Sequence, residues 1–505
     1  MKERYIASID QGTTGTRFMV FNKKGEEISS AYEEHEQIYP KPGWVEHNPL
    51  EIWENTKRVI RKAIEKKDLD PKKIEGIGVT NQRETTLLWD PQTGKPLCNA
   101  LVWQCTRTRD ICQALIDRGL DELVKKQTGL LVNTYFSAPK IKWILDNIPT
   151  AREKVERGKA IFGNMDTWLI WKLTGGVNGG KHVTDYTNAS RTMLMNLKRL
   201  EWDNEILEEL NIPRELLPSL RPSSDKSIYG YTKKDGPLGA EIPICGDLGD
   251  QQAALFGQNC CQPGEAKNTY GTGCFVLLNT GAKLFISKSG LLTTVAYSLE
   301  EGKATYALEG SIAVTGAAIQ WLRDNLGLIK EASETEEIAG SVPDSGGVYF
   351  VPAFSGLFAP YWDMYARGAI VGLTRFIRKE HLVRATLESI CYQTRDVAEA
   401  MIADSGVELK SLKVDGGAAK NNFLMQLQAD ILGVPCIRPA FIETTALGAT
   451  YCAGLAIGFW ENLEELRKSW KIERVFEPKW DKDKREKEYK GWKKAIGCTK
   501  NWVDR

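Results

Sequence analysis

The first eighty residues alternate short apolar runs with a longer amphipathic stretch. Apolar runs at 5–10 and 16–21 are separated by the polar loop Q-G-T-T-G, which predicts a β-hairpin, with a third strand near 26–31. Asn48 is a good N-cap for the amphipathic helix that follows. The apolar run at 74–80 then predicts a buried strand parallel to the first. Strands that alternate with helices in this way indicate an α/β layer fold.

The second half of the chain repeats this scheme. Residues 265–280 read again as strand, Gly/Thr turn and strand, and helices are predicted near 315–324 and over about 380–404. A short strand at 412–417 runs into a glycine pair, and a further helix is predicted at 421–432. Two such units predict two related lobes that face one another.

The length of the chain agrees with two lobes, because 505 residues are too many for one hydrophobic core. The turn C-C-Q-P-G at 260–264 is the predicted boundary. We therefore expect an N-terminal lobe over residues 1–258 and a C-terminal lobe over residues 259–505.

The composition excludes several classes of partner. The formal net charge is +1, which offers no electrostatic footprint for nucleic acid or an anionic membrane. The first ten residues lack the apolar core of a signal peptide, and no apolar run reaches about eighteen residues. We therefore expect a cytoplasmic protein without membrane insertion. Eleven cysteines without a C-x-x-C pair, and four scattered histidines, argue against a disulfide framework or a zinc site.

The segment D-Q-G-T-T-G-T-R at 10–17 is the strongest local signal for a phosphate site. Its glycines expose backbone N–H groups that can form an anion nest, and its threonines add hydroxyl donors. Asp10, at the end of the first strand, could hold Mg²⁺, and Arg17 adds a positive charge. A plain hairpin turn is an equally good interpretation of this segment alone.

Two later segments favour the phosphate site over the plain hairpin turn. The turn N-T-Y-G-T-G at 268–273 occupies the matching place in the second lobe, so facing turns could clamp a triphosphate between the lobes. The segment D-G-G-A-A-K-N-N at 415–422 would let a flat ligand approach the backbone at the start of a helix. An ordinary connection from strand to helix would also favour glycine there.

An acceptor site is predicted at the carboxyl ends of two other strands. Arg83 and Glu84 follow the strand at 74–80 and offer a donor fork beside an acceptor, which suits vicinal hydroxyls. Their alternative is a simple ion pair. Asp250 opens the helix Q-Q-A-A-L-F, where it is either the N-cap or a base that takes the proton of an attacking alcohol.

Six long motifs together resemble the FGGY family of carbohydrate kinases, in particular its members that act on glycerol. The resemblance extends from about residue 4 to about residue 495. The motifs are D-Q-G-T-T-G-T-R, G-V-T-N-Q-R-E-T-T, Y-F-S-A-P-K-I-K-W-I-L-D-N, G-D-Q-Q-A-A-L-F-G, N-T-Y-G-T-G-C-F and V-D-G-G-A-A-K-N-N-F-L-M-Q. The resemblance implies an actin-like, ribonuclease H-like fold, with ATP and an acceptor in the cleft between two lobes.

The resemblance also implies roles for individual residues. It implies that Mg²⁺ lies near Asp10, and that Asp250 is the base in forming sn-glycerol 3-phosphate and ADP. The implied ligands of the nucleotide are Thr13, Thr14, Gly15, Arg17, Gly271, Thr272, Gly316, Gln320, Gly417 and Asn421. The implied ligands of glycerol are Arg83, Glu84, Tyr135, Asp250 and Gln251, with Trp103 and Phe275 over its carbon skeleton.

One departure from the family concerns regulation. In bacterial members that act on glycerol, a loop of the type G-x-x-G-x-R binds the inhibitor fructose 1,6-bisphosphate. Residues 236–241 read G-P-L-G-A-E here, so Glu241 stands in place of the arginine. A carboxylate repels a bisphosphate, so we expect this inhibition to be weak or absent. The resemblance further implies a homo-oligomer, either a dimer or a tetramer.

Two alternatives stay open at this point. The acceptor could be another polyol or a ketose such as xylulose, although Trp103 and Tyr135 beside Arg83 and Glu84 favour glycerol. A protein of another class, an actin-like ATPase that only cycles between conformations, would share the fold and the phosphate turns. Such an ATPase has no use for the Arg–Glu pair or for a base facing the γ-phosphate.

Overall fold

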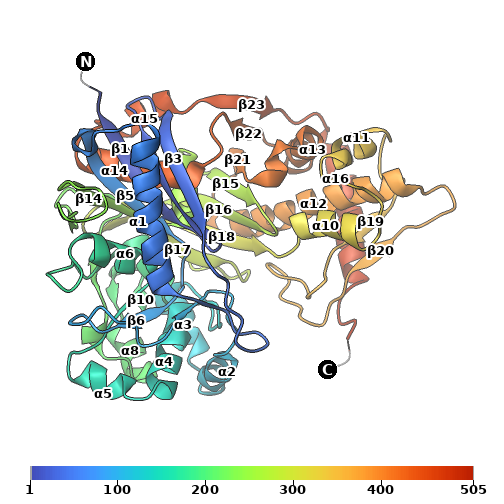
Figure 1. Cartoon of the computed structure of the whole chain (residues 1–505). Helices are drawn as coiled ribbons and strands as arrows, with labels where there is room; N and C mark the ends of the chain where they lie inside the picture. The colour runs from blue at the N-terminus through green and yellow to red at the C-terminus, as the bar shows by residue number, and fades with distance from the viewer. Residues whose placement is uncertain (1–2, 504–505) are drawn as a thin grey trace.

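Two mixed β-sheets form the centre of the molecule, each built by one half of the chain (Figure 1). The computed structural model describes residues 3–503. The first sheet contains β1 (Tyr5–Gln11), β2 (Gly15–Phe21), β3 (Glu27–Glu34), β5 (Ile74–Asn81), β13 (Gly230–Tyr231) and β14 (Pro243–Gly249). The second contains β15 (Glu265–Tyr270), β16 (Cys274–Gly281), β17 (Leu292–Glu300), β18 (Lys303–Ile312), β21 (Ser411–Asp415), β22 (Cys436–Pro439) and β23 (Ile472–Phe476).

Five strands of each sheet are paired in the same order and with the same orientation. In the first, β1 pairs antiparallel with β2 and parallel with β5, β2 pairs antiparallel with β3, and β14 pairs parallel with β5. In the second, β15 pairs antiparallel with β16 and parallel with β21, β16 pairs antiparallel with β18, and β22 pairs parallel with β21. The predicted α/β fold with two related lobes is therefore confirmed. Each sheet lies on one side of the predicted boundary after residue 258, although the boundary itself stays a prediction.

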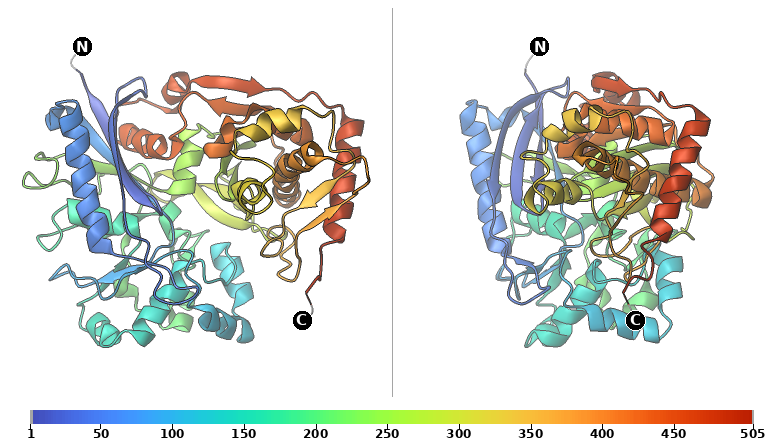
Figure 2. Two further views of the ribbon diagram at one scale, coloured as in Figure 1. Left: turned by 45° about the vertical axis from the view of Figure 1, so that its right-hand side comes forward. Right: turned by 90° about the vertical axis from the view of Figure 1, so that its right-hand side faces the viewer.

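Sixteen α-helices surround the sheets in the described part of the chain (Figure 2). They are α1 (Pro49–Lys66), α2 (Arg109–Asp117), α3 (Asp121–Thr128), α4 (Ser137–Asn147), α5 (Ala151–Glu156), α6 (Met165–Leu173), α7 (Tyr186–Ala189), α8 (Asn204–Leu210), α9 (Asp250–Gly257), α10 (Gly316–Asp324), α11 (Glu334–Gly340), α12 (Lys379–Ser405), α13 (Asn422–Leu432), α14 (Thr444–Ala456), α15 (Leu463–Ser469) and α16 (Lys482–Gly497). None of those helices within residues 3–503 has the length and apolar character needed to cross a bilayer.

The helix predicted after Asn48 illustrates how local signals set these elements. The Asn48 side chain accepts a hydrogen bond from the Leu50 N–H at 3.0 Å, which satisfies a donor that the helix itself leaves unpaired. Ile52, Val59 and Ile60 of α1 are fully buried, as the amphipathic pattern predicts. The same pattern predicted β5 correctly, since this strand is buried and parallel to β1.

Residues 82–221, between β5 and the β13–β14 hairpin, form a mostly helical insertion that the sequence pattern did not predict. It holds α2 to α8 and, in Figure 1, lies below the first sheet. Its short strands are β6 (Leu87–Trp89), β7 (Ala100–Leu101), β8 (Ile161–Gly163), β9 (Val183–Asp185), β10 (Met195–Asn196), β11 (Glu201–Trp202) and β12 (Ser219–Arg221); elsewhere the small strands are β4 (Glu46–His47), β19 (Tyr349–Val351) and β20 (Ala369–Val371). Leu292, Val295 and Tyr306 of the second sheet belong to the apolar core of this insertion, so it connects both lobes.

Helices α9 and α14 make the closest contact between elements from the two halves of the chain. A Cβ on Gly257 would lie 1.9 Å from the Thr444 carbonyl oxygen, and a Cβ on Gly448 would lie 1.9 Å from the Ala253 carbonyl oxygen. Helix α14 comes late in the chain yet packs on β1, β5 and β14 of the first sheet, and Figure 1 shows it beside β1. Glycine is required at both positions because the two backbones touch.

We predict that Gly448→Ala destabilises the protein by about 1–3 kcal/mol, because the added methyl forces α9 and α14 apart. The measurement is the shift of the first thermal unfolding transition. Gly497→Ala in α16 is the control, since a Cβ there would meet no atom within 4 Å. Equal melting of the two variants would contradict the prediction.

Candidate active site

The first Gly/Thr turn lies between β1 and β2, as predicted. The Gly12 N–H donates to the Gly15 carbonyl at 2.9 Å and closes the turn. A Cβ on Gly15 would lie 2.6 Å from the Glu33 carbonyl oxygen, so this position requires glycine. Among residues 3–503, no acceptor is bound to the N–H groups of Thr13 and Thr14. These two N–H groups are therefore free to bind an anion.

Asp10 and Arg17 lie opposite each other on β1 and β2, at the base of this turn. Burial raises the pKa of Asp10 to about 7, with Arg17 opposing the shift and the carboxylates of Asp250 and Glu443 adding to it. No donor among residues 3–503 hydrogen-bonds its carboxylate, which suits a site for a divalent cation. Arg17 instead makes an ion pair with Glu443, and its guanidinium lies 5.4 Å from the centroid of the Tyr32 ring. Its predicted contact with phosphate stays a prediction that would require Arg17 to leave Glu443.

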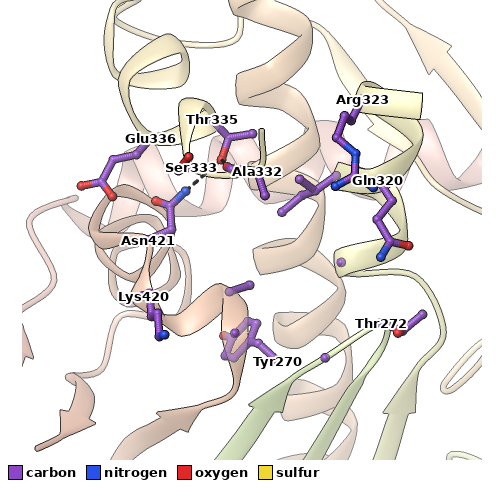
Figure 3. A pocket seen from close by; sticks show the side chains of 15 residues that line it. Tyr270, Thr272, Gln320, Arg323, Ala332, Ser333, Thr335, Glu336, Lys420 and Asn421 are labelled. Carbon is purple, nitrogen blue, oxygen red and sulfur yellow. Dashed lines mark hydrogen bonds between the residues drawn. The ribbon is translucent and has the colours of Figure 1, made fainter. Parts of the chain in front are cut away.

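A pocket of about 460 Å³ lies beside the second Gly/Thr turn (Figure 3). Six of the residues expected to bind the nucleotide line this pocket together: Gly271, Thr272, Gly316, Gln320, Gly417 and Asn421. The Thr272 carbonyl accepts hydrogen bonds from the N–H groups of Thr315 at 3.0 Å and Ala317 at 3.1 Å, which ties the turn to the start of α10. A Cβ on Gly316 would lie 2.7 Å from the Gly271 carbonyl oxygen, so α10 can approach the turn only through glycine.

The opposite wall of the pocket was not predicted. It comes from the residues just before α11 and from the first turn of this helix, and Figure 3 shows the Asn421 and Thr335 side chains joined by a hydrogen bond on this side of the pocket. The Asn421 amide donates to the Thr335 hydroxyl at 3.0 Å, while its oxygen accepts from the Leu424 N–H at 2.9 Å. Both ends of the Asn421 side chain are thus occupied. The Glu-rich sequence of α11 resembles an ordinary solvated helix, so no signal in it pointed to a pocket.

The predicted acceptor residues Arg83 and Glu84 belong to a buried ring of alternating charges. Arg83 binds Glu309 through two nitrogens, at 2.5 and 3.1 Å, and Arg191 binds Glu309 at 3.1 Å and Glu84 at 2.7 Å. All four side chains are at most 2% exposed. Two cations and two anions in this arrangement are mutually neutralised, as burial of charge requires. Arg191 and Glu309 were missed because neither lies in a Gly-rich or strand-end motif.

The pKa values of the two carboxylates in the ring are shifted in opposite directions. Burial alone would raise the pKa of Glu309, but the guanidiniums of Arg191 and Arg83 outweigh it and lower the pKa to about 2. At Glu84 burial outweighs the same two arginines, so its pKa is raised. Glu84 also has φ 59°, which a residue other than glycine rarely adopts. Strain of this kind, held by an ion pair to Arg191, is typical of functional sites.

Asp250 lies next to this ring, and its side chain is partly exposed. Its Oδ1 lies 3.2 Å from the Arg83 Nε and accepts from the Gln251 N–H at 2.7 Å, and 28% of its side chain is exposed. The N-cap of α9 is Gly249, so the alternative in which Asp250 is the N-cap is wrong. The ring therefore positions Asp250 while leaving its carboxylate accessible.

The neighbouring glutamines have different environments. Gln251, an expected ligand of the acceptor, accepts a hydrogen bond from the buried Lys267, which also donates to the Thr269 hydroxyl at 2.9 Å. Burial lowers the pKa of Lys267 to about 8. Gln252, which was not predicted, accepts from Arg83 at 3.1 Å. Lys267 therefore connects Gln251 to β15, the strand that leads into the second turn, whereas Gln252 connects Arg83 to β17.

Two of the three expected aromatic residues lie together. The Trp103 and Tyr135 rings meet edge to face at 5.5 Å, and the Arg83 guanidinium donates to the Tyr135 hydroxyl at 3.5 Å. The Trp103 indole N–H donates to the Thr13 hydroxyl at 3.0 Å, so the residues expected to bind the acceptor adjoin the first turn. Phe275, on β16, packs against the apolar cluster formed around α9 and α14.

Glu241 is exposed and lies 3.5 Å from the ammonium group of Lys234. No positively charged residue replaces it within the loop at 236–241. The expected insensitivity to fructose 1,6-bisphosphate stays a prediction.

The whole chain is similar to known kinases. Residues 5–257 match the N-terminal domain of the FGGY family of carbohydrate kinases, and residues 266–457 match its C-terminal domain. The chain therefore belongs to the FGGY family of carbohydrate kinases. It is 61% identical over 501 residues to a protein of Caldanaerobacter subterraneus subsp. tengcongensis named glycerol kinase, covering 99% of both chains.

Solved structures agree with this family. The crystal structure of Plasmodium falciparum glycerol kinase with ADP matches with a TM-score of 0.93 and 39% identity, over 98% of both chains. The ligand-bound xylulose kinase of Lactobacillus acidophilus matches with a TM-score of 0.84 and 25% identity, over 98% of this chain and 96% of that one. The resemblance to FGGY kinases and the two-lobed fold are confirmed.

We predict that Asp10→Asn stabilises the protein at pH 8. The folded-state pKa of about 7 lies above the ordinary value for aspartate, so ionisation of Asp10 costs stability as the pH rises. That cost is complete above pH 7 and shrinks below it, and asparagine does not have it. The melting temperature of Asp10→Asn should therefore exceed that of the unmodified protein at pH 8, by a margin that falls towards pH 5. Asp117→Asn on α2 is the control, and a margin independent of pH would contradict the prediction.

Proposed function

We propose that this protein transfers the γ-phosphate of ATP to a terminal hydroxyl of glycerol and forms sn-glycerol 3-phosphate and ADP. The observation that carries the proposal is the position of Asp250, partly open and 3.2 Å from Arg83, beside the buried Arg83–Glu84 pair. The relative at 61% identity, which is named glycerol kinase, supports the same substrate.

Glycerol suits the side chains gathered around Arg83. A three-carbon triol has one polar edge and one small apolar edge. Arg83 and Glu84 offer a donor and an acceptor for hydroxyls, and the Trp103 and Tyr135 rings offer an apolar surface. A buried polar group left without a partner costs about 1–3 kcal/mol, so such a site discriminates against analogues that lack a hydroxyl.

In the proposed reaction Asp250 accepts the proton of the glycerol hydroxyl as its oxygen bonds to the γ-phosphorus. The bond from that phosphorus to the bridging β–γ oxygen breaks, and ADP leaves with the bond's electron pair. Such a transition state is largely dissociative and asks mainly for alignment and charge stabilisation. The N–H groups of Thr13 and Thr14 would bind phosphate oxygens from one lobe, and the turn at Gly271 and Thr272 would bind them from the other.

The same proposal gives Asp10 the role of holding Mg²⁺. Its carboxylate fits this role because it is free of hydrogen-bond donors in the described chain, and because burial and, to a lesser extent, the nearby Asp250 carboxylate raise its pKa, which a bound cation would offset. Mg²⁺ bound there would offset the negative charge that develops on the phosphate oxygens. Assembly into a dimer or tetramer stays a prediction from the family resemblance.

Two other functions compete with this one. A ketose such as xylulose remains the main alternative acceptor, because the xylulose kinase of Lactobacillus acidophilus shares the fold. A conformational ATPase of actin-like fold is the alternative from another class. The ring of Arg83, Glu84, Arg191 and Glu309 argues against it, since that ring has no role in a cycle that lacks an acceptor.

We predict that release of ADP from ATP depends on glycerol, and that glycerol has a higher kcat/KM than xylulose or any other sugar in a panel of polyols and ketoses. The measurement is coupled detection of ADP with and without each acceptor. A sugar with a higher kcat/KM than glycerol would replace glycerol as the substrate. ADP release that ignores every acceptor would favour the conformational ATPase.

We predict that Asp250→Asn lowers kcat by about 10²–10⁴-fold, because an amide cannot take the proton of the alcohol. Glycerol should still bind, since Arg83 and Glu84 remain, and calorimetric titration with glycerol measures this. Asp117→Asn is again the control for the loss of a negative charge. A near-normal kcat in Asp250→Asn would remove Asp250 from the role of base.

A further inference from the structure

Every backbone carbonyl of the first Gly/Thr turn accepts a hydrogen bond from another group of the first lobe. The Gly12 carbonyl accepts from the Gln11 amide at 2.8 Å and the Gln82 amide at 3.3 Å. The Thr13 carbonyl accepts from the Gln37 amide at 2.9 Å, and the Thr14 carbonyl accepts from the His35 N–H at 3.2 Å. In a trans peptide the N–H of one residue points in the opposite direction to the C=O of the residue before it. These tethers therefore direct the Thr13 and Thr14 N–H groups away from the first lobe.

The side chains that make two of these tethers form one hydrogen-bonded relay through His47. Gln82 lies within hydrogen-bonding distance of His47 Nδ1, at 3.2 Å, and His47 Nε2 lies 3.0 Å from Gln37 Oε1. The Thr85 hydroxyl donates to Gln82 Oε1 at 2.9 Å, which fixes the Gln82 amide with its NH₂ group towards His47. Gln82 also donates to Gln11 Oε1 at 3.1 Å. The relay thus touches the turn at Gly12 and again at Thr13.

The contacts of Gln37 set the position of the ring proton. The NH₂ group of Gln37 donates to the Thr13 carbonyl, so its Oε1 faces His47 Nε2 and accepts the proton that this nitrogen carries. His47 Nδ1 is then an acceptor facing the Gln82 NH₂ group, whose two N–H bonds are shared among His47 Nδ1, Gln11 Oε1 and the Gly12 carbonyl. Burial lowers the pKa of His47 to about 3, so the ring stays neutral and keeps a single proton near neutral pH.

The second turn achieves the same result with backbone groups. The Gly271 carbonyl accepts from the Gly316 N–H at 3.1 Å, and the Thr272 carbonyl accepts from the first residues of α10. The carbonyls of both turns thus accept hydrogen bonds. In the second lobe the donors are N–H groups at the start of a helix, whereas in the first lobe they include glutamine side chains that His47 helps to orient.

We propose that Gln37, held by His47 and Gln82, is a positioning residue that fixes the Thr13 peptide so that the turn's N–H groups face the nucleotide phosphates. The proposal rests on the proposed function, in that the anion at this turn is the triphosphate of ATP. Gln37 is half-buried and belongs to a loop, so its replacement leaves both sheets intact. Without its amide, the Thr13 peptide can rotate and present its carbonyl oxygen to the phosphates.

The test compares Gln37→Met, which keeps the length of the side chain and removes the amide, with the unmodified protein. Calorimetric titration with Mg-ATP and, separately, with adenosine gives two affinities for each variant. We expect the affinity for ATP to fall about five- to tenfold, the loss of one hydrogen bond, while the affinity for adenosine stays unchanged. The KM for glycerol should also stay unchanged. Gln113→Met on the exposed face of α2 is the matched control, and both of its affinities should equal those of the unmodified protein.

Three outcomes would overturn the proposal: unchanged ATP affinity in Gln37→Met, an equal loss for ATP and adenosine, or the same loss in Gln113→Met. Gln37→Leu, which differs in shape, should reproduce the loss that is specific for ATP, and failure to do so would also count against it. These titrations need no acceptor. They therefore stay informative if glycerol is not the substrate, a failure that would appear as ADP release that ignores glycerol in the unmodified protein.

Discussion

The geometry of the candidate active site depends on the distance between α9 and α14. Gly257 and Gly448 bring the two backbones into contact, and these helices connect the two sheets. Asp250 opens α9, whereas Thr272 lies in a turn of the second sheet, so the helix contact sets their relative position. A methyl group at that contact would therefore disturb the cleft as well as the stability of the fold.

The carbonyls of the two Gly/Thr turns accept hydrogen bonds from different kinds of donor. In the proposed function each turn presents N–H groups to a ligand while its own carbonyls remain hydrogen-bonded, because an unpaired buried carbonyl is costly. The second turn uses the start of α10, which supplies unpaired N–H groups. The first turn faces no helix start and uses the side chains of Gln37 and Gln82. The two halves of the chain share a topology, yet this detail follows from local sequence.

Much of the fold could be predicted because its signals are local. The hairpins around the two turns, the cap at Asn48 and the strand at 74–80 each depend on neighbouring residues, and the structure agrees with them. Six of the ten residues expected around the nucleotide also line one pocket, since turns and strand ends keep their place in a layered sheet. Their contacts with a nucleotide stay predictions.

The rest could not be predicted because it depends on contacts between distant residues. Glu309 lies 226 positions from Arg83, and in the sequence it reads as an ordinary residue within a strand. Lys267 likewise looks like a solvated strand residue, yet it is buried. The insertion at 82–221 consists of short helices and strands, and its apolar core includes Leu292, Val295 and Tyr306 of the second sheet, which are far away in the sequence.

The charge ring has a consequence for the folding of the chain during its synthesis. Residues up to 258 supply two of its cations, Arg83 and Arg191, but only one of its anions, Glu84. The second anion, Glu309, comes from the other half of the chain. In an emerging N-terminal half, Arg83 would keep Asp250 as a neighbour at 3.2 Å, whereas both guanidiniums would lack Glu309. The buried ring of four charges can therefore close only after β18 has left the ribosome and docked.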